Sequence, residues 1–515
     1  MKRKLPLLFI IFIATACAPE TSASPSHDDF VIDDMSIYVY ENKTLPEQYT
    51  YTYEGTDIEI NDNIVNGLKA ATTTEVTAHG VGDQTATFTV EVANRPYTSR
   101  HETAETNENW FDEVSVAAVA DLAADFPLGV DVSTAKRIYD RGGHYYNREG
   151  NEQSLFQILK DGGVNYVRLR LWHDPYNYYE EGGEAKVLGY GGGYCDLDNV
   201  TWMAHEAKAA GLSFYLDFHM SDFWSDPSKQ VIPKAWKDLT TAEEIATALQ
   251  EYTTATITHL AENEAMPDIV SIGNEINLGL LVHYPGGTNT SVTGQEPLYI
   301  SGRSNLPSAI AGRYTANGTN ENLCLYMQAG IDGIKAVSDD IEIMIHYAKS
   351  FNAPDQIITF YNTFNDLDYD IIGLSGYSYW HFNNMSNISM GLTTVHNAFP
   401  DKKISIVETS YGFTYEADTW ASNSFSSTST NNVRPMSGYA VSPQGQAQFV
   451  RDVTNQLNMV DNSYGIFYWE GAWIPKSMAG WADDATKSSW ANQGFFSYDG
   501  KALGSLEVFK QIRGV

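Results

Sequence analysis

Cysteine is nearly absent from this 515-residue sequence. Only Cys17, Cys195 and Cys324 occur, and none of them has the CxxC spacing that zinc sites use. This scarcity excludes a zinc motif of that kind. A single disulfide between Cys195 and Cys324 is compatible with an exported protein, and the sequence leaves that pairing open.

Positive charge and long apolar runs are also scarce. The 32 Lys and Arg face 65 Asp and Glu, so the formal net charge is −33. Such a chain repels phosphate backbones, which excludes nucleic acid as an expected partner. Beyond the N-terminal segment no run of 18 apolar residues occurs, so no further membrane span is expected. The chain has instead 32 Tyr and 11 Trp, which build cores and flat platforms for sugars.

The N-terminus has the order of a bacterial lipoprotein signal. Basic residues at 2–4 precede an apolar stretch at 5–13, and small residues then lead to Cys17. We expect cleavage before Cys17, which would then carry lipid and anchor an outer-membrane lipoprotein at the cell surface, and the sequence leaves open a periplasm-facing anchor. An ordinary signal peptide with an incidental cysteine is the alternative. Residues 18–28 are small, polar and Pro-containing, as in a flexible tether.

Short strand-like runs fill residues 29–96. "SIYVY", "YTYTY" and "TATFTVEVA" alternate and are rich in Thr, Val and Tyr. The end of this stretch resembles bacterial immunoglobulin-like domains, which implies a small β-sandwich that acts as a spacer or, alternatively, binds sugar. Residues 97–125 are polar and then Ala-rich, as expected of a linker with a lead-in helix.

From residue 126 to 515, strand-like and helix-like segments alternate. This order predicts a parallel sheet, and eight such units fit a (β/α)₈ TIM barrel with long loops. The fold class is therefore α/β, with a small all-β domain before the barrel. The eight candidate strands are residues 128–133, 164–172, 212–219, 268–275, 341–347, 371–378, 404–410 and 464–470.

Polar and aromatic residues stand where the candidate strands end, at the edge that carries the active site in such barrels. They include Arg168, Arg170, Trp172, Asp217, His219, Asp222, Asn274, Glu275, His346, Tyr377, Tyr379, Glu408, Trp469 and Glu470. A single strand-end glutamate is ordinarily a side chain that reaches water. Two glutamates among strand ends that converge on one face indicate a catalytic site.

Glu275 and Glu408 suit glycoside hydrolysis, which needs one protonated and one ionised carboxyl. A carboxyl separation of about 5 Å predicts retention through a covalent glycosyl-enzyme. Asn274 is expected to hydrogen-bond the sugar 2-hydroxyl. Arg170 or a neighbouring residue is expected to hold Glu408 ionised.

The motifs "YVRLRLWHDP", "LDFHMSDFWSDPSKQ", "IGNEIN", "IVETSYG" and "YWEGAWIP" resemble glycoside hydrolase family 53, the endo-β-1,4-galactanases. The resemblance covers roughly residues 126–515 and implies a retaining mechanism on a (β/α)₈ barrel. It implies that Glu275 is the acid/base and Glu408 the nucleophile. It also implies that Trp469 floors the subsite of the cleaved sugar and that Tyr377 binds substrate. The residues that it implies on the glycone side are Asp217, His219, Asp222 and Trp224.

No cofactor is required by this chemistry, although several bacterial members of the family carry a structural calcium after the nucleophile strand. Here only Glu416, Asp418 and Asn423 could serve as ligands. Gly376 and Gly471 also depart from the family pattern. His173 and Cys195 are expected to be structural, while His283 and Tyr284 either bind substrate or cap their loop. The Gly-rich run at 189–196 lacks the Lys and Ser of a phosphate-binding loop.

The expected function is hydrolysis of β-1,4-galactan, the pectic type I arabinogalactan, to galacto-oligosaccharides by an exported monomer. Two alternatives remain. One is a non-catalytic galactan-binding lipoprotein on the same barrel, which would be free to lose a glutamate. The other is a retaining glycosidase that attacks a mannan or a xylan.

Overall fold

The chain forms two compact units, Met1–Ala93 and Asn94–Val515. The computed structural model describes residues 30–38, 41–61, 63–69, 71–82, 84–95, 110–181, 184–189, 194–286, 304–418, 423–426, 433–481 and 487–515. The predicted signal peptide, Cys17 and the tether at 18–28 lie outside these residues. Among the described residues, no helix is both long and apolar enough to cross a membrane.

The first unit is all-β, as the sequence predicts. One sheet has the strand order β1-β7-β6-β3 and the other β2-β5-β4. Alternate side chains of β6 and β7 are buried, including Val76, Phe88 and Val90, because successive residues of a strand point to opposite faces. The strands are β1 (Met35–Tyr38), β2 (Asn42–Thr44), β3 (Thr50–Tyr53), β4 (Ile58–Asn61), β5 (Ile64–Gly67), β6 (Thr72–His79) and β7 (Thr85–Ala93).

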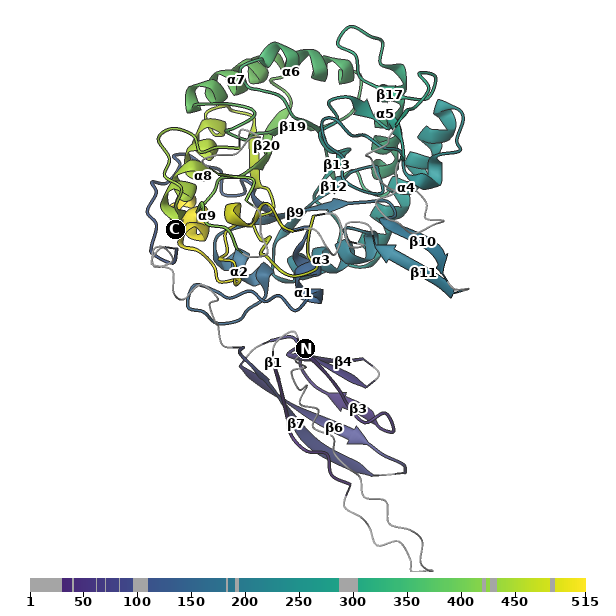
Figure 1. Ribbon diagram of the computed structural model, residues 1–515, viewed down its shortest axis with the longest axis vertical. Coiled ribbons are helices and arrows are strands. Elements are labelled where there is room, and N and C mark those ends of the chain that lie inside the picture. Colours follow the sequence, from purple (N-terminus) through teal and green to yellow (C-terminus); the bar gives the residue numbers. More distant parts are fainter. Residues whose placement is uncertain are drawn as a thin grey trace, which may run out of the picture. The chain divides into compact units, whose positions relative to one another are not determined.

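The second unit is a closed barrel of eight parallel strands, which confirms the predicted TIM barrel (Figure 1). Every strand expected from the sequence is present. β21 pairs with β8, and this pairing closes the ring. In chain order the strands are β8 (Leu128–Asp131), β9 (Tyr166–Leu171), β12 (Ser213–Phe218), β13 (Ile269–Ile272), β18 (Glu342–Tyr347), β19 (Ile371–Ser375), β20 (Lys403–Thr409) and β21 (Ser463–Tyr468).

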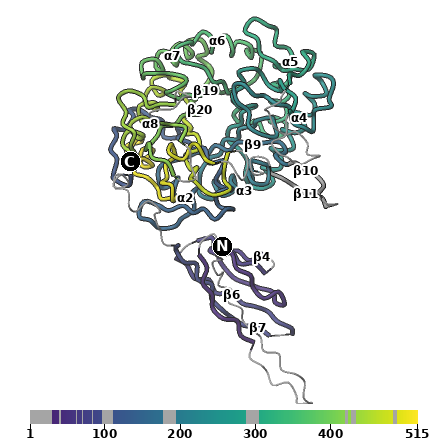
Figure 2. Tube along the Cα trace, viewed as in Figure 1, coloured from purple at the N-terminus to yellow at the C-terminus, as the bar shows by residue number. Residues whose placement is uncertain are grey.

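Helices surround the barrel strands (Figure 2). They are α1 (Ala135–Asp140), α2 (Leu155–Asp161), α3 (Leu197–Ala209), α4 (Ala242–Glu262), α5 (Glu321–Lys335), α6 (Pro354–Tyr361), α7 (Met385–Ala398), α8 (Pro443–Leu457) and α9 (Val508–Arg513). The longest, α4, begins at a capping box in which Thr241 and Glu244 satisfy each other's free backbone N–H groups. Its apolar face, with Ile245, Leu249 and Ile257, is buried in the core.

Short strands lie in the loops of this unit. β10 (Tyr176–Glu181) pairs with β11 (Glu184–Gly189), β14 (Gly279–Leu280) with β17 (Gly312–Arg313), and β15 (His283–Tyr284) with β16 (Ser304–Asn305).

The barrel interior is apolar at one level and charged at the next. Tyr215, Ile269, Met344, Ile371, Val407 and Phe467 form one buried cluster inside the ring. Gly129 of β8 leaves the room that the Phe467 ring occupies, since a Cβ there would lie 2.2 Å from the ring. The charged level consists of Asp131, Arg168, Asp217 and Glu408, which come from β8, β9, β12 and β20 and are all buried.

The backbone turns sharply after β13. Gly273 has φ +87°, a value that glycine adopts without steric cost. Glu275 has φ +45°, in the left-handed region that side chains usually avoid. This turn directs Glu275 across the mouth of the barrel instead of along the strand.

Candidate active site

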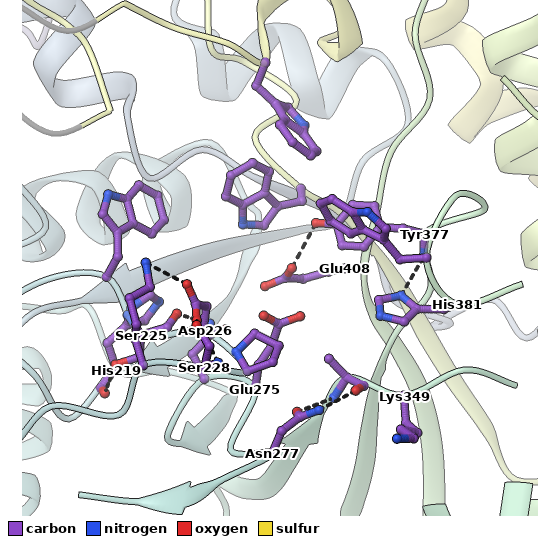
Figure 3. A pocket seen from close by; sticks show the side chains of 18 of the residues that line it. His219, Ser225, Asp226, Ser228, Glu275, Asn277, Lys349, Tyr377, His381 and Glu408 are labelled. Atoms are coloured by element: carbon purple, nitrogen blue, oxygen red, sulfur yellow. Dashed lines mark hydrogen bonds and ion pairs between the residues drawn. The ribbon is translucent and has the colours of Figure 1, made fainter. Parts of the chain in front are cut away.

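A cleft of about 810 Å³ opens at the carboxyl ends of the barrel strands. Figure 3 shows Glu275 and Glu408 facing each other within it. The sequence assigns a role in catalysis or substrate binding to ten barrel residues. Seven of them line this cleft, namely His219, Trp224, Asn274, Glu275, Tyr377, Glu408 and Trp469. The remaining three, Arg170, Asp217 and Asp222, are buried behind it.

Glu408, near the end of β20, accepts two strong hydrogen bonds. The Arg168 guanidinium donates to Oε1 at 2.8 Å, and the Tyr377 hydroxyl donates to Oε2 at 2.9 Å. Both donors stabilise the ionised carboxylate. The Glu408 side chain is 7% exposed, so its carboxylate lines the cleft with little contact with water.

Glu275 has a different environment. Its Oε1 accepts a hydrogen bond of 2.7 Å from the Ser375 hydroxyl at the end of β19. Ser375 Oγ in turn lies 2.9 Å from His346 Nε2. Because the Ser375 hydrogen points to Glu275, His346 Nε2 must carry the proton that it donates to Oγ. Burial lowers the pKa of His346 to about 3, so this imidazole is neutral.

These two environments give the two carboxyls different pKa values. Burial raises the pKa of Glu408 to about 7, and the Arg168 charge and the Tyr377 hydroxyl oppose that rise. Burial raises the pKa of Glu275 well above its ordinary value, the negative charge of Glu408 adds to the rise, and only Ser375 and Arg168 oppose it. Glu408 therefore ionises first, and Glu275 keeps its proton to higher pH.

Arg168 is the centre of the charged level. Besides Glu408 it donates to Asp131 and Asp217, both at 2.7 Å, and to Asn274 Oδ1 at 3.0 Å. The sequence pointed to Arg170 or a neighbour as the partner of Glu408, and the neighbour Arg168 fills that position. Arg170 instead pairs with Glu470 and lies 4.0 Å from the centre of the Trp224 ring.

Asp217 and His219 differ in their access to the cleft. Asp217 is completely buried, which corrects the expectation that it lines the glycone side. Burial opposes its ionisation, yet Arg168 holds its pKa well below the usual range. His219 Nδ1 accepts from the Ser225 amide at 3.0 Å and the Trp172 indole at 3.3 Å. Its Nε2–H therefore faces Asp217 Oδ2, 3.4 Å away.

Asp222 is also a correction, because its carboxylate joins two loops and does not line the cleft. It accepts backbone hydrogen bonds from Asp174 at 3.1 Å and from Lys234 at 2.7 Å. His283 likewise caps its loop, since its Nδ1 accepts from the Gln230 amide at 3.3 Å. A local sequence pattern does not distinguish such loop-holding groups from substrate-binding ones.

Tryptophans build the walls of the cleft. Trp469 lies 6.1 Å from Trp224 and 4.7 Å from Trp490 between ring centres. Trp380 and Trp481 line the same cleft and are 48% and 39% exposed, which suits rings that bind flat sugar faces. Sequence reasoning missed Trp380, Trp481 and Trp490. Trp380 directly follows the strand-end residue Tyr379 and could have been found, whereas Trp481 and Trp490 stand well beyond the end of β21, where no strand-end signal marks them.

The other sequence expectations fall away from the cleft. Cys195 and Cys324 are both free, so the disulfide left open by the sequence is absent from this structure. The Asn423 amide donates to the backbone oxygens of Tyr415 and Glu416, at 3.2 and 2.5 Å. Among the described residues, no group of three or more His, Cys, Asp or Glu could hold a metal ion. Calcium in this loop therefore stays a prediction.

The part of the chain that forms the barrel is also the part that matches known proteins. The family model of glycosyl hydrolase family 53 matches residues 127–509. The chain belongs to glycosyl hydrolase family 53. This family 53 chain is 30% identical over 433 residues to the endo-β-1,4-galactanase of Bacillus subtilis (strain 168), covering 78% of this chain and 89% of that one.

Two further proteins are similar to this chain. The arabinogalactan endo-β-1,4-galactanase of Cellvibrio japonicus (strain Ueda107) is 29% identical over 411 residues, covering 77% of this chain and 95% of that one. The solved GH53 catalytic domain of Ignisphaera aggregans has a TM-score of 0.64 and 36% identity, covering 78% of this chain and 99% of that one. The family resemblance read from the motifs is confirmed.

Proposed function

We propose that this family 53 chain is an endo-β-1,4-galactanase that retains anomeric configuration. The observation that carries the proposal is the division between its two carboxyls. Glu408 accepts from a guanidinium and a phenol, whereas Glu275 accepts from a single serine hydroxyl. The names of the relatives support β-1,4-galactan as substrate.

In the first step Glu408 attacks the anomeric carbon. Glu275 donates its proton to the glycosidic oxygen, so the leaving sugar departs as a neutral alcohol. Asn274 uses its carbonyl oxygen on Arg168 and one amide hydrogen on the Ser225 carbonyl. Its second amide hydrogen is available for the 2-hydroxyl of the sugar being cleaved, and Trp469 floors that subsite.

In the second step Glu275, now ionised, removes a proton from water, and the hydroxide displaces Glu408 from the sugar. Arg168 and Tyr377 stabilise the departing carboxylate just as they stabilise the free one. Every proton moves between side chains, sugar and water, so the chemistry needs no cofactor. A structural calcium near Glu416, Asp418 and Asn423 would lie outside these steps.

The location and accessory parts of the chain are part of the same proposal. A lipidated Cys17 would hold a monomeric enzyme at the outer membrane, facing the medium. The all-β unit would be an immunoglobulin-like spacer between the lipid anchor and the barrel. The basic, apolar, small-residue order before Cys17 and the two small sheets of that unit support this assignment.

The test is incubation with unbranched β-1,4-galactan, followed by separation of products by size. An endo-acting galactanase releases a ladder of galacto-oligosaccharides, and the Glu408→Gln variant releases none. Binding of galactan without products would identify a carbohydrate-binding protein instead. Products from mannan or xylan, but not from galactan, would identify a different glycosidase.

A further inference from the structure

One lysine in the wall of the cleft has no counter-ion among the described residues. Lys349 follows β18, is partly buried and lines the same cleft as Glu275 and Glu408. In the part of the chain that the structure describes, its ammonium makes no hydrogen bond or ion pair. The other lysine of the cleft, Lys229, is neutralised by Asp226 at 2.6 Å.

The loop that carries Lys349 is held on both sides. The Ala348 N–H donates to Asn277 Oδ1 at 3.0 Å, and Asn277 Nδ2 donates back to the Ala348 carbonyl at 2.5 Å. The Ser350 hydroxyl donates to the His381 carbonyl at 3.0 Å. Because its two neighbours are held, the backbone of Lys349 is fixed beside the cleft, and a ligand has little loop ordering to impose.

The position of Lys349 relative to the two glutamates indicates which sugars of a bound chain it would meet. Asn277, which holds its loop, is two residues beyond Glu275. Figure 3 shows Asn277 and Lys349 beyond Glu275, on the side away from Glu408. The general acid protonates the oxygen that departs with the leaving sugar, so the sugars past Glu275 are those of the leaving group.

A neutral galactan chain offers this cation hydroxyl oxygens but no counter-charge. The formal net charge of the whole sequence is −33, so an anionic polymer would approach the protein against a general repulsion. A local cation inside the cleft offsets that repulsion at one sugar position. Oxidation of one terminal carbon of a sugar to a carboxylate adds little bulk, which fits a cleft already lined by tryptophan rings.

We propose that Lys349 forms a leaving-group subsite for a sugar that carries a carboxylate. The inference rests on the proposed galactanase function and narrows it to galactan joined to acidic sugar on its reducing side. The partner of Lys349 is then the substrate itself.

The test uses galacto-oligosaccharides of four to six residues in matched pairs. In each pair the reducing end is either reduced to a neutral alditol or oxidised to an aldonate, whose carboxylate probes the subsite. At the chain length that brings the carboxylate to Lys349, we expect wild-type kcat/KM to be roughly three- to tenfold higher for the aldonate. This preference should shrink in about 0.5 M NaCl, because salt screens the pair.

Variants separate charge from shape. Lys349→Met should remove the aldonate preference or reverse it, and Lys349→Arg should keep it. Lys335→Met makes the same change of charge on α5, where the lysine pairs with Asp368, and should leave the preference intact. An aldonate preference absent at every length, or retained by Lys349→Met, would overturn the subsite. Failure to cleave any neutral alditol would instead overturn the galactanase proposal.

Discussion

Ser375→Ala removes the hydroxyl that donates to Glu275 and leaves the two carboxyls in place. That hydrogen bond is 2.7 Å long and lies between a fully buried serine and the catalytic acid. A hydrogen bond to a charged group contributes about 1.5–3 kcal/mol. One pKa unit corresponds to about 1.36 kcal/mol. The pKa of Glu275 should therefore rise by roughly one to two units when the donor is lost.

The sign of the effect is fixed by the role of the acid. Activity falls at high pH when Glu275 loses its proton, so a higher pKa moves the alkaline limb of kcat/KM upward by about one to two pH units. A weaker acid also donates less readily, and kcat on galactan should fall about tenfold. Aryl galactosides with a good leaving group need no proton, so their first step should be nearly unchanged.

The assay is a pH profile of kcat/KM on both substrates for wild type and variants. Ser405→Ala is the matched control, because Ser405 is an equally buried barrel serine that donates to the neutral Gly465 carbonyl at 3.0 Å. An unmoved alkaline limb, with equal losses on galactan and aryl galactoside, would refute the reasoning and make Ser375 a packing residue.

Four further outcomes are expected. Activity should rise with pH as Glu408 ionises. Arg168→Lys cannot keep all the hydrogen bonds of the guanidinium, so it should move this acid limb to higher pH and lower kcat about 10²-fold or more. An unchanged acid limb in the kcat/KM profile would contradict the assignment. Glu275→Ala with azide should yield the β-galactosyl azide and Glu408→Ala the α-anomer, as seen by NMR; reversed products would exchange the two roles. Cys17→Ala should move the protein from the membrane to the soluble fraction, since stable anchoring depends on the lipid chains, and unchanged fractionation would contradict the anchor. A chain that begins at Asn94 should keep kcat on soluble oligosaccharides. A chain that begins after Trp110 should unfold at a lower temperature in calorimetry, because the buried Trp110 ring lies 5.0 Å from Phe413 and 5.5 Å from Tyr498 between ring centres. Equal unfolding temperatures of the two chains would contradict this role of Trp110.

The barrel was predictable because its signal is repeated. Each of the eight strands is an apolar run that ends on polar residues, and this pattern recurs along the chain even where single residues depart from it. The two glutamates were predictable for the same reason, since strand ends of a parallel barrel share one edge. Family motifs then divided their roles, which the pattern alone leaves open.

The interior of the charged level was not predictable to the same degree. Arg168 and Arg170 are two residues apart on β9, so their side chains lie on the same face of the strand and the sequence pattern treats them alike. Only the closed ring shows that Arg168 contacts Glu408 while Arg170 contacts Glu470. Asp222 looked like a cleft residue because it follows a strand motif, yet its partners are the backbone amides of Asp174, in the loop after β9, and of Lys234, later in its own loop.

Barrel closure also decides how much of the chain must be present before the protein can act. Arg168 draws its partners from β8, β12, the turn after β13 and β20, so a nascent chain that stops before Glu408 lacks the nucleophile itself. The ring closes only when β21 pairs with β8, within the last tenth of the chain. An incomplete barrel would leave these charges without their full set of partners, which is costly in a dry interior. Activity should therefore require Tyr468 together with the cleft residues that follow it, such as Trp469 and Trp490, and no shorter fragment should show a weaker form of it.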